Sequence, residues 1–317
     1  MDIVDLHCDL LSYLAVNPDR TPLHPEVRCS GPQLKSGNVK VQVLAISAMT
    51  DYASLLIGLK QIEIFHSLTK KYSEFFTQDN IIPAFENASA FCTEQEPLEA
   101  VFKRLESILE NLTPLYISLT WNGENRFGGG CGANVGLKPD GKELLRFLSG
   151  RGIAIDFSHT SDLLAYDIFK SIDQEGLDLK VMASHSNFRS VVDHPRNLPN
   201  TIAQEIIRRK GIIGLVLYPK FLGSLKCLAK QIEYGLNLGG EKALAFGADF
   251  FFTDDWQSAL TEPVGFFDEM SDSSKYPSII HTLKNEFKLS PEVLQNLCHQ
   301  NALEFLTQTQ TTIKGKK

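Results

Sequence analysis

Short apolar runs alternate with amphipathic segments along almost the whole chain. Eight runs are nearly continuous in apolar residues, as expected of strands that are buried on both faces. They are 2–7, 40–47, 81–86, 115–120, 152–158, 180–184, 212–218 and 243–249. Between them, apolar residues recur at helical spacing, over 53–76, 98–111, 140–150, 161–175, 199–210 and 228–237.

Eight strands separated by helices predict an α/β fold, specifically a (β/α)8 TIM barrel. A doubly wound open sheet is the alternative, but the first strand-to-helix junction lacks a glycine-rich phosphate loop. A closing helix is expected over 290–307, because Ser290-Pro291-Glu292 places an N-cap before a proline. The chain shows no internal repeat, low-complexity tract or linker, so residues 1–317 are expected to form a single domain.

Composition narrows the classes of protein to which the chain can belong. Of its 317 residues, 43% are hydrophobic and 22% are charged, which is a globular balance. The net charge is −7 and no basic run precedes the last few residues, so no nucleic-acid partner is expected. We find neither a signal peptide nor an apolar stretch of the ~18 residues that a membrane helix needs. Six cysteines without a CxxC pair are typical of reduced thiols, so a cytoplasmic location without membrane insertion is expected.

Histidines lie at the ends of three predicted strands, where barrel enzymes carry their active sites. The first strand ends in His7-Cys8-Asp9, and the fifth and sixth end in His159 and His185. Residues two apart on an extended chain face the same side, so His7 and Asp9 can bind one ion while Cys8 packs the other way. This pair alone is equally compatible with a simple histidine–carboxylate contact. The two later histidines favour a metal site.

Two carboxylates end other predicted strands. Glu86 follows an apolar strand, and a buried carboxylate needs a partner, which two cations would provide; a surface glutamate just past the strand is the alternative. Asp249 ends the last strand, where it could take a proton from a metal-bound water and deliver it to a leaving group. A helix N-cap role for Asp249 is equally compatible with the sequence. The remaining histidines are expected to be structural: His24, His66, His194, His281 and His299.

In this order, the strand-end segments resemble those of the renal-type membrane dipeptidase family. These are zinc metallopeptidases with an amidohydrolase-like barrel. The resemblance extends over nearly the whole chain. It rests on Asp5-Leu6-His7-Cys8-Asp9-Leu10, Phe85-Glu86-Asn87-Ala88, Ile155-Asp156-Phe157-Ser158-His159-Thr160-Ser161, Ala183-Ser184-His185-Ser186, Asp193-His194-Pro195-Arg196-Asn197-Leu198-Pro199 and Gly247-Ala248-Asp249-Phe250.

The resemblance implies a metal-dependent hydrolase with two Zn²⁺ ions per chain, bridged by Glu86. One zinc would bind His7, Asp9 and Glu86. The other would share Glu86 and bind His159 and His185. Manganese or cobalt could also occupy a site with these mixed ligands.

The resemblance also implies a dipeptidase, in which a hydroxide that bridges the two ions attacks the peptide bond of a short peptide. Arg196 would hold the free carboxylate of the dipeptide, and Asp249 would carry the proton and contact the substrate amine. The second residue of the substrate could have D configuration. Family analogy further suggests a homodimer.

One residue departs from the pattern of the family. Members such as the mammalian enzyme have a histidine after the fourth strand that binds the oxyanion, whereas this chain has Trp121. Oxyanion stabilisation is then left to a zinc or to another donor, and the indole is expected to line and narrow the substrate pocket. Two other functions stay open. One is a different binuclear-metal hydrolase that acts on a cyclic amide, lactone or phosphoester. The other is a non-catalytic relative that acts as a binding protein.

Overall fold

The chain forms a closed barrel of eight parallel strands in sequential order, which confirms the predicted (β/α)8 fold. The structure is a computed structural model that describes residues 1–256 and 265–314. The strands are β1 (Ile3–Cys8), β2 (Val39–Ser47), β3 (Ile81–Glu86), β4 (Tyr116–Ser118), β5 (Ala154–Asp156), β6 (Val181–Ala183), β7 (Ile212–Leu215) and β8 (Leu244–Phe246).

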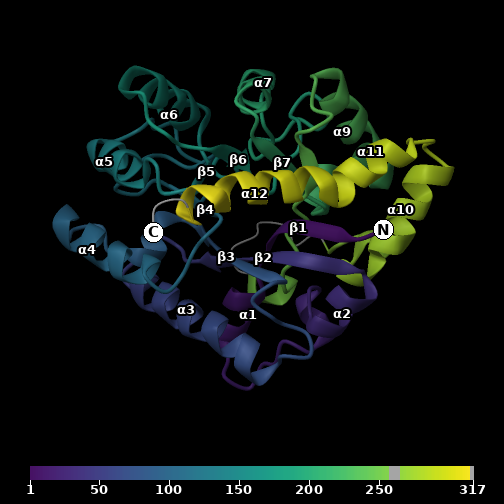
Figure 1. Ribbon diagram of the computed structural model, residues 1–317, viewed down its shortest axis with the longest axis horizontal. Helices are drawn as coiled ribbons and strands as arrows, with labels where there is room; N and C mark the ends of the chain where they lie inside the picture. The colour runs from purple at the N-terminus through teal and green to yellow at the C-terminus, as the bar shows by residue number, and fades with distance from the viewer. Residues whose placement is uncertain (257–264, 315–317) are drawn as a thin grey trace.

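Helices surround the barrel, and Figure 1 shows them as an outer layer around the strands. The α-helices are α1 (Leu10–Val16), α2 (Gly31–Ser36), α3 (Ser54–Lys71), α4 (Leu98–Leu109), α5 (Pro139–Leu148), α6 (Asp162–Glu175), α7 (Asn200–Arg208), α8 (Pro219–Leu222), α9 (Leu225–Asn237), α10 (Tyr276–Asn285), α11 (Pro291–Gln295) and α12 (Asn301–Lys314). Short 3₁₀ helices occupy Pro25–Val27, Ala88–Phe91, Thr253–Trp256, Asp268–Met270 and Ser273–Lys275. A π-helical turn, Asn296–Gln300, joins α11 to α12.

Most predicted elements lie within a few residues of the observed ones, but β4 to β8 are shorter than their apolar runs. The fifth run was expected over 152–158, whereas strand pairing ends at Asp156. The reason is local: the carboxylate of Asp156 accepts a hydrogen bond from the amide of Ser158 (3.3 Å), so the chain turns toward the barrel end. The segment expected to be helical at 290–307 continues as α12 to Lys314.

Helix α6 illustrates how local sequence signals set the ends of a helix. The Ser161 hydroxyl accepts a hydrogen bond from the amide of Leu164 (3.0 Å), which satisfies a free N–H of the first turn. Gly176 ends the helix with φ 61°, a left-handed conformation that suits glycine. Helix α6 therefore begins three residues after His159, and its start helps to fix the loop that carries this imidazole.

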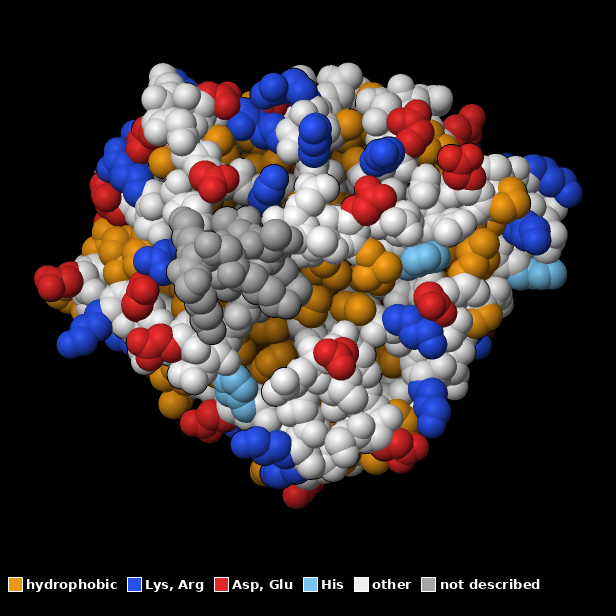
Figure 2. All heavy atoms as spheres, in the orientation of Figure 1, with side chains coloured by type: hydrophobic (Ala, Val, Ile, Leu, Met, Phe, Trp, Pro, Cys, Tyr) orange, Lys and Arg blue, Asp and Glu red, His pale blue; other side chains and the backbone are white. Residues whose placement is uncertain are grey.

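Helix α12 closes the amino-terminal end of the barrel. Phe305 and Leu306 pack with Leu6 of β1, Met182 of β6 and other side chains that point into the barrel from the strands. Figure 2 shows this face, where acidic and basic side chains are interspersed around hydrophobic ones on the coloured residues. The strand ends that carry polar groups therefore face the opposite, carboxyl-terminal end of the barrel.

Within residues 1–256 and 265–314, no helix combines the length and the hydrophobicity needed to traverse a bilayer.

The first and last strands meet at a short seam. Strand β1 pairs with β8 only through Asp5 and Phe246, whereas β2 and β3 pair over six residues. The buried carboxylate of Asp5 reinforces the seam, because it accepts hydrogen bonds from the amides of His7 (3.2 Å) and Ala248 (3.0 Å). It also accepts one from the Tyr276 hydroxyl (2.6 Å). Burial raises the pKa of Asp5 to about 6.

Candidate metal centre

Three imidazoles from different strands converge on one carboxylate oxygen. Glu86 ends β3 and is buried, and its Oε1 atom lies near the Nε2 atoms of three histidines. The distances are 2.7 Å to His159, 3.4 Å to His185 and 3.7 Å to His7. A surface position for Glu86 is therefore wrong. The barrel brings together at one point four side chains that are far apart in the sequence.

These contacts fit a cation better than direct hydrogen bonds alone. The Nε2 atoms of His159 and His185 lie 2.9 Å apart. Arg196 Nη2 lies 3.2 Å from the same atom of His159, and because a guanidinium only donates, this Nε2 acts as an acceptor. Two ligands at ~2.0 Å from one tetrahedral zinc would lie about 3.3 Å apart. The observed spacings are therefore those of atoms that could share a metal ion.

Asp9 and Asp249 complete the cluster on the side of His7. Ligand atoms of these three residues all lie within 4.8 Å of one another, and Asp249 Oδ1 is 3.5 Å from His7 Nε2. Among the described residues, His7 Nε2 and Asp9 Oδ1 have no hydrogen-bond partner although both are buried. Buried polar atoms without partners are costly, and a metal ion would satisfy both.

Asp249 adopts an unusual backbone conformation, with φ 62°. Non-glycine residues rarely occupy this region, and such strain is concentrated at functional sites. No helix begins directly after Asp249, so the N-cap alternative is wrong. Instead the chain continues into Phe250, whose carbonyl accepts a hydrogen bond from the amide of Asp9 (3.0 Å).

Burial and like charges perturb the pKa values of the whole cluster. Burial lowers the pKa of His159 to about 4 and that of His185 to about 3, and nearby Arg196 adds to both shifts. Burial, followed by the charge of Glu86, raises the pKa of Asp9 and Asp249 well above the usual range. Neutral imidazoles beside crowded carboxylates are a suitable ligand set for divalent cations, which bind unprotonated histidine.

For Glu86 itself, opposing effects act on the pKa. Burial alone would raise it, but the charge of His7 and the close contact with His159 lower the pKa of Glu86 well below its usual value. Glu86 is therefore the carboxylate of the cluster that stays ionised most readily. An anionic oxygen between three imidazoles is suited to bridging two cations.

Arg196 reaches the cluster from the loop between β6 and α7. Its side chain is buried, and its Nε and Nη1 atoms have no hydrogen-bond partner within the described part of the chain. The loop conformation holds it in place, since the Arg196 amide donates to Nδ1 of His194 (3.1 Å) and the guanidinium lies 5.3 Å from the Phe221 ring. His194 is thus structural. The free guanidinium donors are available to a ligand anion.

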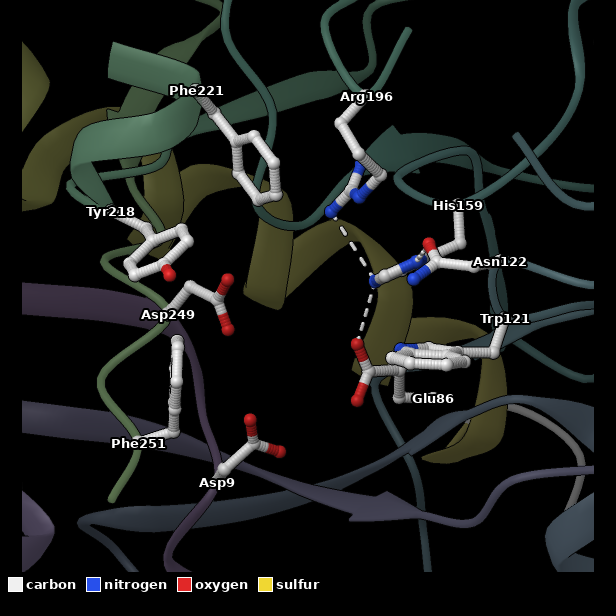
Figure 3. Close-up of a pocket in the computed structure, with 10 residues that line it drawn as sticks. All are labelled: Asp9, Glu86, Trp121, Asn122, His159, Arg196, Tyr218, Phe221, Asp249 and Phe251. Atoms are coloured by element: carbon white, nitrogen blue, oxygen red, sulfur yellow. Dashed lines mark hydrogen bonds and ion pairs between the residues drawn. The ribbon is translucent and has the colours of Figure 1, made fainter. Parts of the chain in front are cut away.

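The cluster opens into a cavity of about 110 Å³ with aromatic walls. Figure 3 shows Trp121 with Asn122 and His159 on one side, Tyr218 and Phe251 on the other, and Phe221 beside Arg196. The carboxylates of Asp9 and Asp249 point into the cavity between these two walls. A cavity that combines aromatic walls, one arginine and a carboxylate cluster suits a small ligand with both apolar and charged parts.

Trp121 is the residue that departs from the sequence pattern of the dipeptidase family. Its ring stacks over His159, with centroids 5.9 Å apart and an angle of 29° between the planes. The indole therefore forms part of the cavity wall beside the proposed ligands, as expected from the sequence. Four further lining residues were not singled out from the sequence as site residues: Asn122, Tyr218, Phe221 and Phe251.

Of these four residues, only Tyr218 had a sequence signal, because it ends the apolar run predicted as the seventh strand. Asn122 is recognisable only in three dimensions, where its Oδ1 atom lies 2.9 Å from His159 Nδ1 and accepts the imidazole proton. Phe221 lies in the single-turn helix α8, which no hydrophobic periodicity announces.

Comparisons with known proteins agree with this geometry. The sequence model of the membrane dipeptidase family, peptidase family M19, matches residues 1–317. Dipeptidase aclJ of Aspergillus oryzae is 30% identical over 155 residues, which cover 47% of this chain and 33% of that protein. An uncharacterized dipeptidase of Schizosaccharomyces pombe is 27% identical over 202 residues, which cover 59% of this chain and 45% of that protein. The matched regions span less than half the length of these two relatives.

Solved structures show the same fold at low sequence identity. A metallopeptidase from Rhodobacter sphaeroides, bound to a phosphinate mimic of the dipeptide L-Ala-D-Ala, superposes with a TM-score of 0.73 at 18% identity. The alignment covers 98% of this chain and 99% of that one. An amidohydrolase from Pseudomonas aeruginosa gives 0.75 at 19% identity over 97% and 96% of the two chains. Because the family model matches the chain from end to end, the protein belongs to the membrane dipeptidase family, peptidase family M19.

Proposed function

We propose that this protein is a zinc-dependent dipeptidase whose whole barrel acts as one catalytic unit. The observation that carries the proposal is the position of Arg196, a buried guanidinium with donors available beside three imidazoles and a shared carboxylate. A metal cluster alone indicates only a hydrolase. An arginine at this distance selects substrates that carry a carboxylate close to the scissile bond.

In this proposal, His7, Asp9, Glu86, His159 and His185 would hold two divalent ions, with Glu86 between them. Ions bound there would polarise the scissile carbonyl and lower the pKa of a water that lies between them. Zinc suits the mixed histidine and carboxylate ligands.

The remaining polar groups would handle the substrate. Arg196 would form a charge-assisted pair with the carboxylate of the second residue. Asp249, whose carboxylate is buried and has a raised pKa, would accept a proton and pass it to the leaving amine. Trp121 and Tyr218 would exclude water from opposite walls of the cavity (Figure 3). The Rhodobacter sphaeroides relative binds a mimic of L-Ala-D-Ala, which supports a D residue at the second position as an accepted substrate feature.

A panel of dipeptides tests the proposal. The purified protein is incubated with L,L- and L,D-dipeptides, N-acetylated dipeptides, a dihydropyrimidine and a lactone, with added Zn²⁺ or with chelator. Chelator-sensitive hydrolysis of free dipeptides is the expected result. Turnover of the lactone or cyclic amide alone would replace the proposal with a different binuclear-metal hydrolase. Two bound metals without turnover on any compound would favour a non-catalytic binding protein.

Trp121→His is the variant that addresses the departure from the family pattern. It replaces the indole with an imidazole that could donate to an oxyanion, an interaction worth on the order of 10²–10³ in rate. A dipeptidase activity that is already high in the parent protein would show that another donor serves this role.

A further inference from the structure

One imidazole of the cluster, that of His185, is connected through its Nδ1 atom to a buried carboxylate that does not itself face the cavity. Asp156 ends β5 and has no exposed surface. Its Oδ2 atom accepts hydrogen bonds from the hydroxyls of Ser118 (2.6 Å) and Ser184 (2.9 Å). Its Oδ1 atom accepts them from the Ser158 hydroxyl (3.0 Å) and the Ser184 amide (2.6 Å). These donors suit an ionised carboxylate, which can only accept.

Ser184 joins this carboxylate to the imidazole of His185. Its Oγ atom lies 2.8 Å from Nδ1 of His185. A hydroxyl has one hydrogen, and that of Ser184 lies on Asp156, so its oxygen can only accept from the imidazole. Donation to the neighbouring Ser158 Oγ, 3.1 Å away, would leave this conclusion unchanged. His185 must then carry its proton on Nδ1, which leaves Nε2 with a lone pair.

We propose that Asp156 is a positioning residue that fixes the tautomer of His185 through Ser184. Nδ1 of His185 is protonated, and Nε2, which lies 3.4 Å from Glu86 Oε1, keeps its lone pair. The assignment of a metal to this Nε2 atom rests on the proposed function, whereas the tautomer rests on the hydrogen bonds alone. Partners on the far nitrogen of a ligand histidine typically change metal affinity by 10–100-fold.

Ser184 variants test the connection by metal affinity. Zn²⁺ binding is measured by competition with a chromophoric chelator. Ser184→Ala should weaken it by about 10–100-fold, while Ser184→Thr, which keeps the hydroxyl, should restore most of the affinity. Ser118→Ala is the matched control, since the Ser118 hydroxyl donates to the same Oδ2 atom but does not contact His185. Equal losses in Ser184→Ala and Ser118→Ala would overturn the proposal, because they would indicate a general structural effect.

Asp156→Asn gives a sharper test. The amide of Ser184 donates to Oδ1, so an oxygen must stay there and the new NH₂ group must take the Oδ2 position. It would donate to Ser184, whose own hydrogen would then turn to Nδ1 of His185. His185 is therefore expected to change to the tautomer with the proton on Nε2.

Long-range ¹H–¹⁵N spectra of histidine-labelled, metal-free protein report these tautomers without any metal or activity. The expected parent spectrum has protonated Nδ1 in His185, with a reversal of this tautomer in Asp156→Asn. A parent His185 protonated on Nε2, or tautomers unchanged in Ser184→Ala and Asp156→Asn, would overturn the proposal. Expected tautomers in a protein that hydrolyses no dipeptide would instead contradict the proposed function alone.

Discussion

The backbone amide of Asp249 donates a hydrogen bond to the carbonyl oxygen of His7 (3.1 Å), while the side chains of the same two residues lie 3.5 Å apart. Backbone pairing across the seam between β1 and β8 thus sets the separation of two side chains in the cluster. The positive φ of Asp249 is part of this arrangement, because it turns the carboxylate toward the cavity.

Replacement of Asp249 by glycine and by alanine should separate its chemical role from its backbone strain. Both variants lack the carboxylate, so both should lose about 10²–10⁴-fold in kcat, as expected for a general acid–base group. Glycine tolerates φ 62° whereas alanine does not, so Asp249→Gly should be more stable than Asp249→Ala by about 1 kcal/mol. Urea denaturation in the presence of chelator measures the difference. Equal stabilities would contradict the strain.

Glu86→Gln should reduce metal content and activity together. The glutamine amide removes the charge that lies near the Nε2 atoms of three histidines, and it offers only one oxygen as a ligand. Elemental analysis after dialysis should find fewer than two zinc ions per chain. Glu96→Gln, which breaks an ion pair with Arg104 on α4, is the matched control and should keep both ions. Full metal loading of Glu86→Gln would remove Glu86 from the bridging position.

Arg196→Ala should raise KM for dipeptides with a free carboxyl terminus. A hydrogen bond to a charged group contributes about 1.5–3 kcal/mol, which corresponds to roughly 10–150-fold. Amidated dipeptides lack the anion and should show little change between parent and variant. Steady-state kinetics on matched pairs of substrates measures the difference, with Arg151→Ala on the surface as control. If both substrate classes respond alike, Arg196 does not read the carboxylate.

Metal removal should lower the free energy of unfolding. Ions that bind only the folded chain stabilise it by about 4 kcal/mol at a free concentration about 1,000-fold above Kd. Without them, the buried Asp9, Glu86 and Asp249 carboxylates repel one another. Thermal unfolding followed by circular dichroism should therefore show a higher Tm with Zn²⁺ than with chelator. An unchanged Tm would argue against metal binding at this buried cluster.

Burial of the cysteines should affect both the pH dependence of folding stability and the order in which the six thiols react. Burial raises the pKa of Cys92 and of Cys298 from the ordinary thiol value of 9.0 to about 12. Between pH 9 and 12 the unfolded chain therefore loses these protons first, so folding stability should fall as pH rises through this range.

At pH 8, brief alkylation followed by peptide mass spectrometry should modify Cys131 and Cys227, which are partly exposed, before the buried thiols. Early modification of Cys92 would contradict its burial.

The sequence was sufficient to predict the barrel and the residues that meet at its carboxyl-terminal end. The strand expected over 81–86 has those bounds, because its apolar run is bounded by a turn on one side and by Glu86 on the other. Histidine or aspartate at the ends of apolar strands indicated which side chains would converge, since parallel strands of a barrel end on the same side. The continuous apolar runs, the helical spacing between them and the polar residues at the ends of the runs contain this information directly.

Other parts of the site depend on contacts that no periodicity encodes. Asn122 and Phe251 lie in loops whose paths are set by packing against distant segments. Phe221 reaches Arg196 only because α8 is a single turn. The hydrogen bonds of Asp156 reach Ser118 and Ser184, which lie 38 and 28 residues away in the sequence. A residue type alone does not reveal which proton it receives. Tertiary structure therefore determines which residues surround the candidate ligands, even though the candidate ligands themselves could be predicted from the sequence.

The narrow seam between β1 and β8 links folding order to ligand binding. His7 lies in the first strand, Asp9 follows that strand and Asp249 follows the last one. The hydrogen bond between Asp5 and Ala248 joins residues that are 243 positions apart in the chain. The half of the site that contains these residues cannot exist until the last strand has docked against the first, whereas Glu86, His159 and His185 come from strands that assemble earlier along the chain. A cation bound by the complete site would in turn stabilise the pairing of β1 with β8, so metal binding and closure of the barrel are a single linked equilibrium.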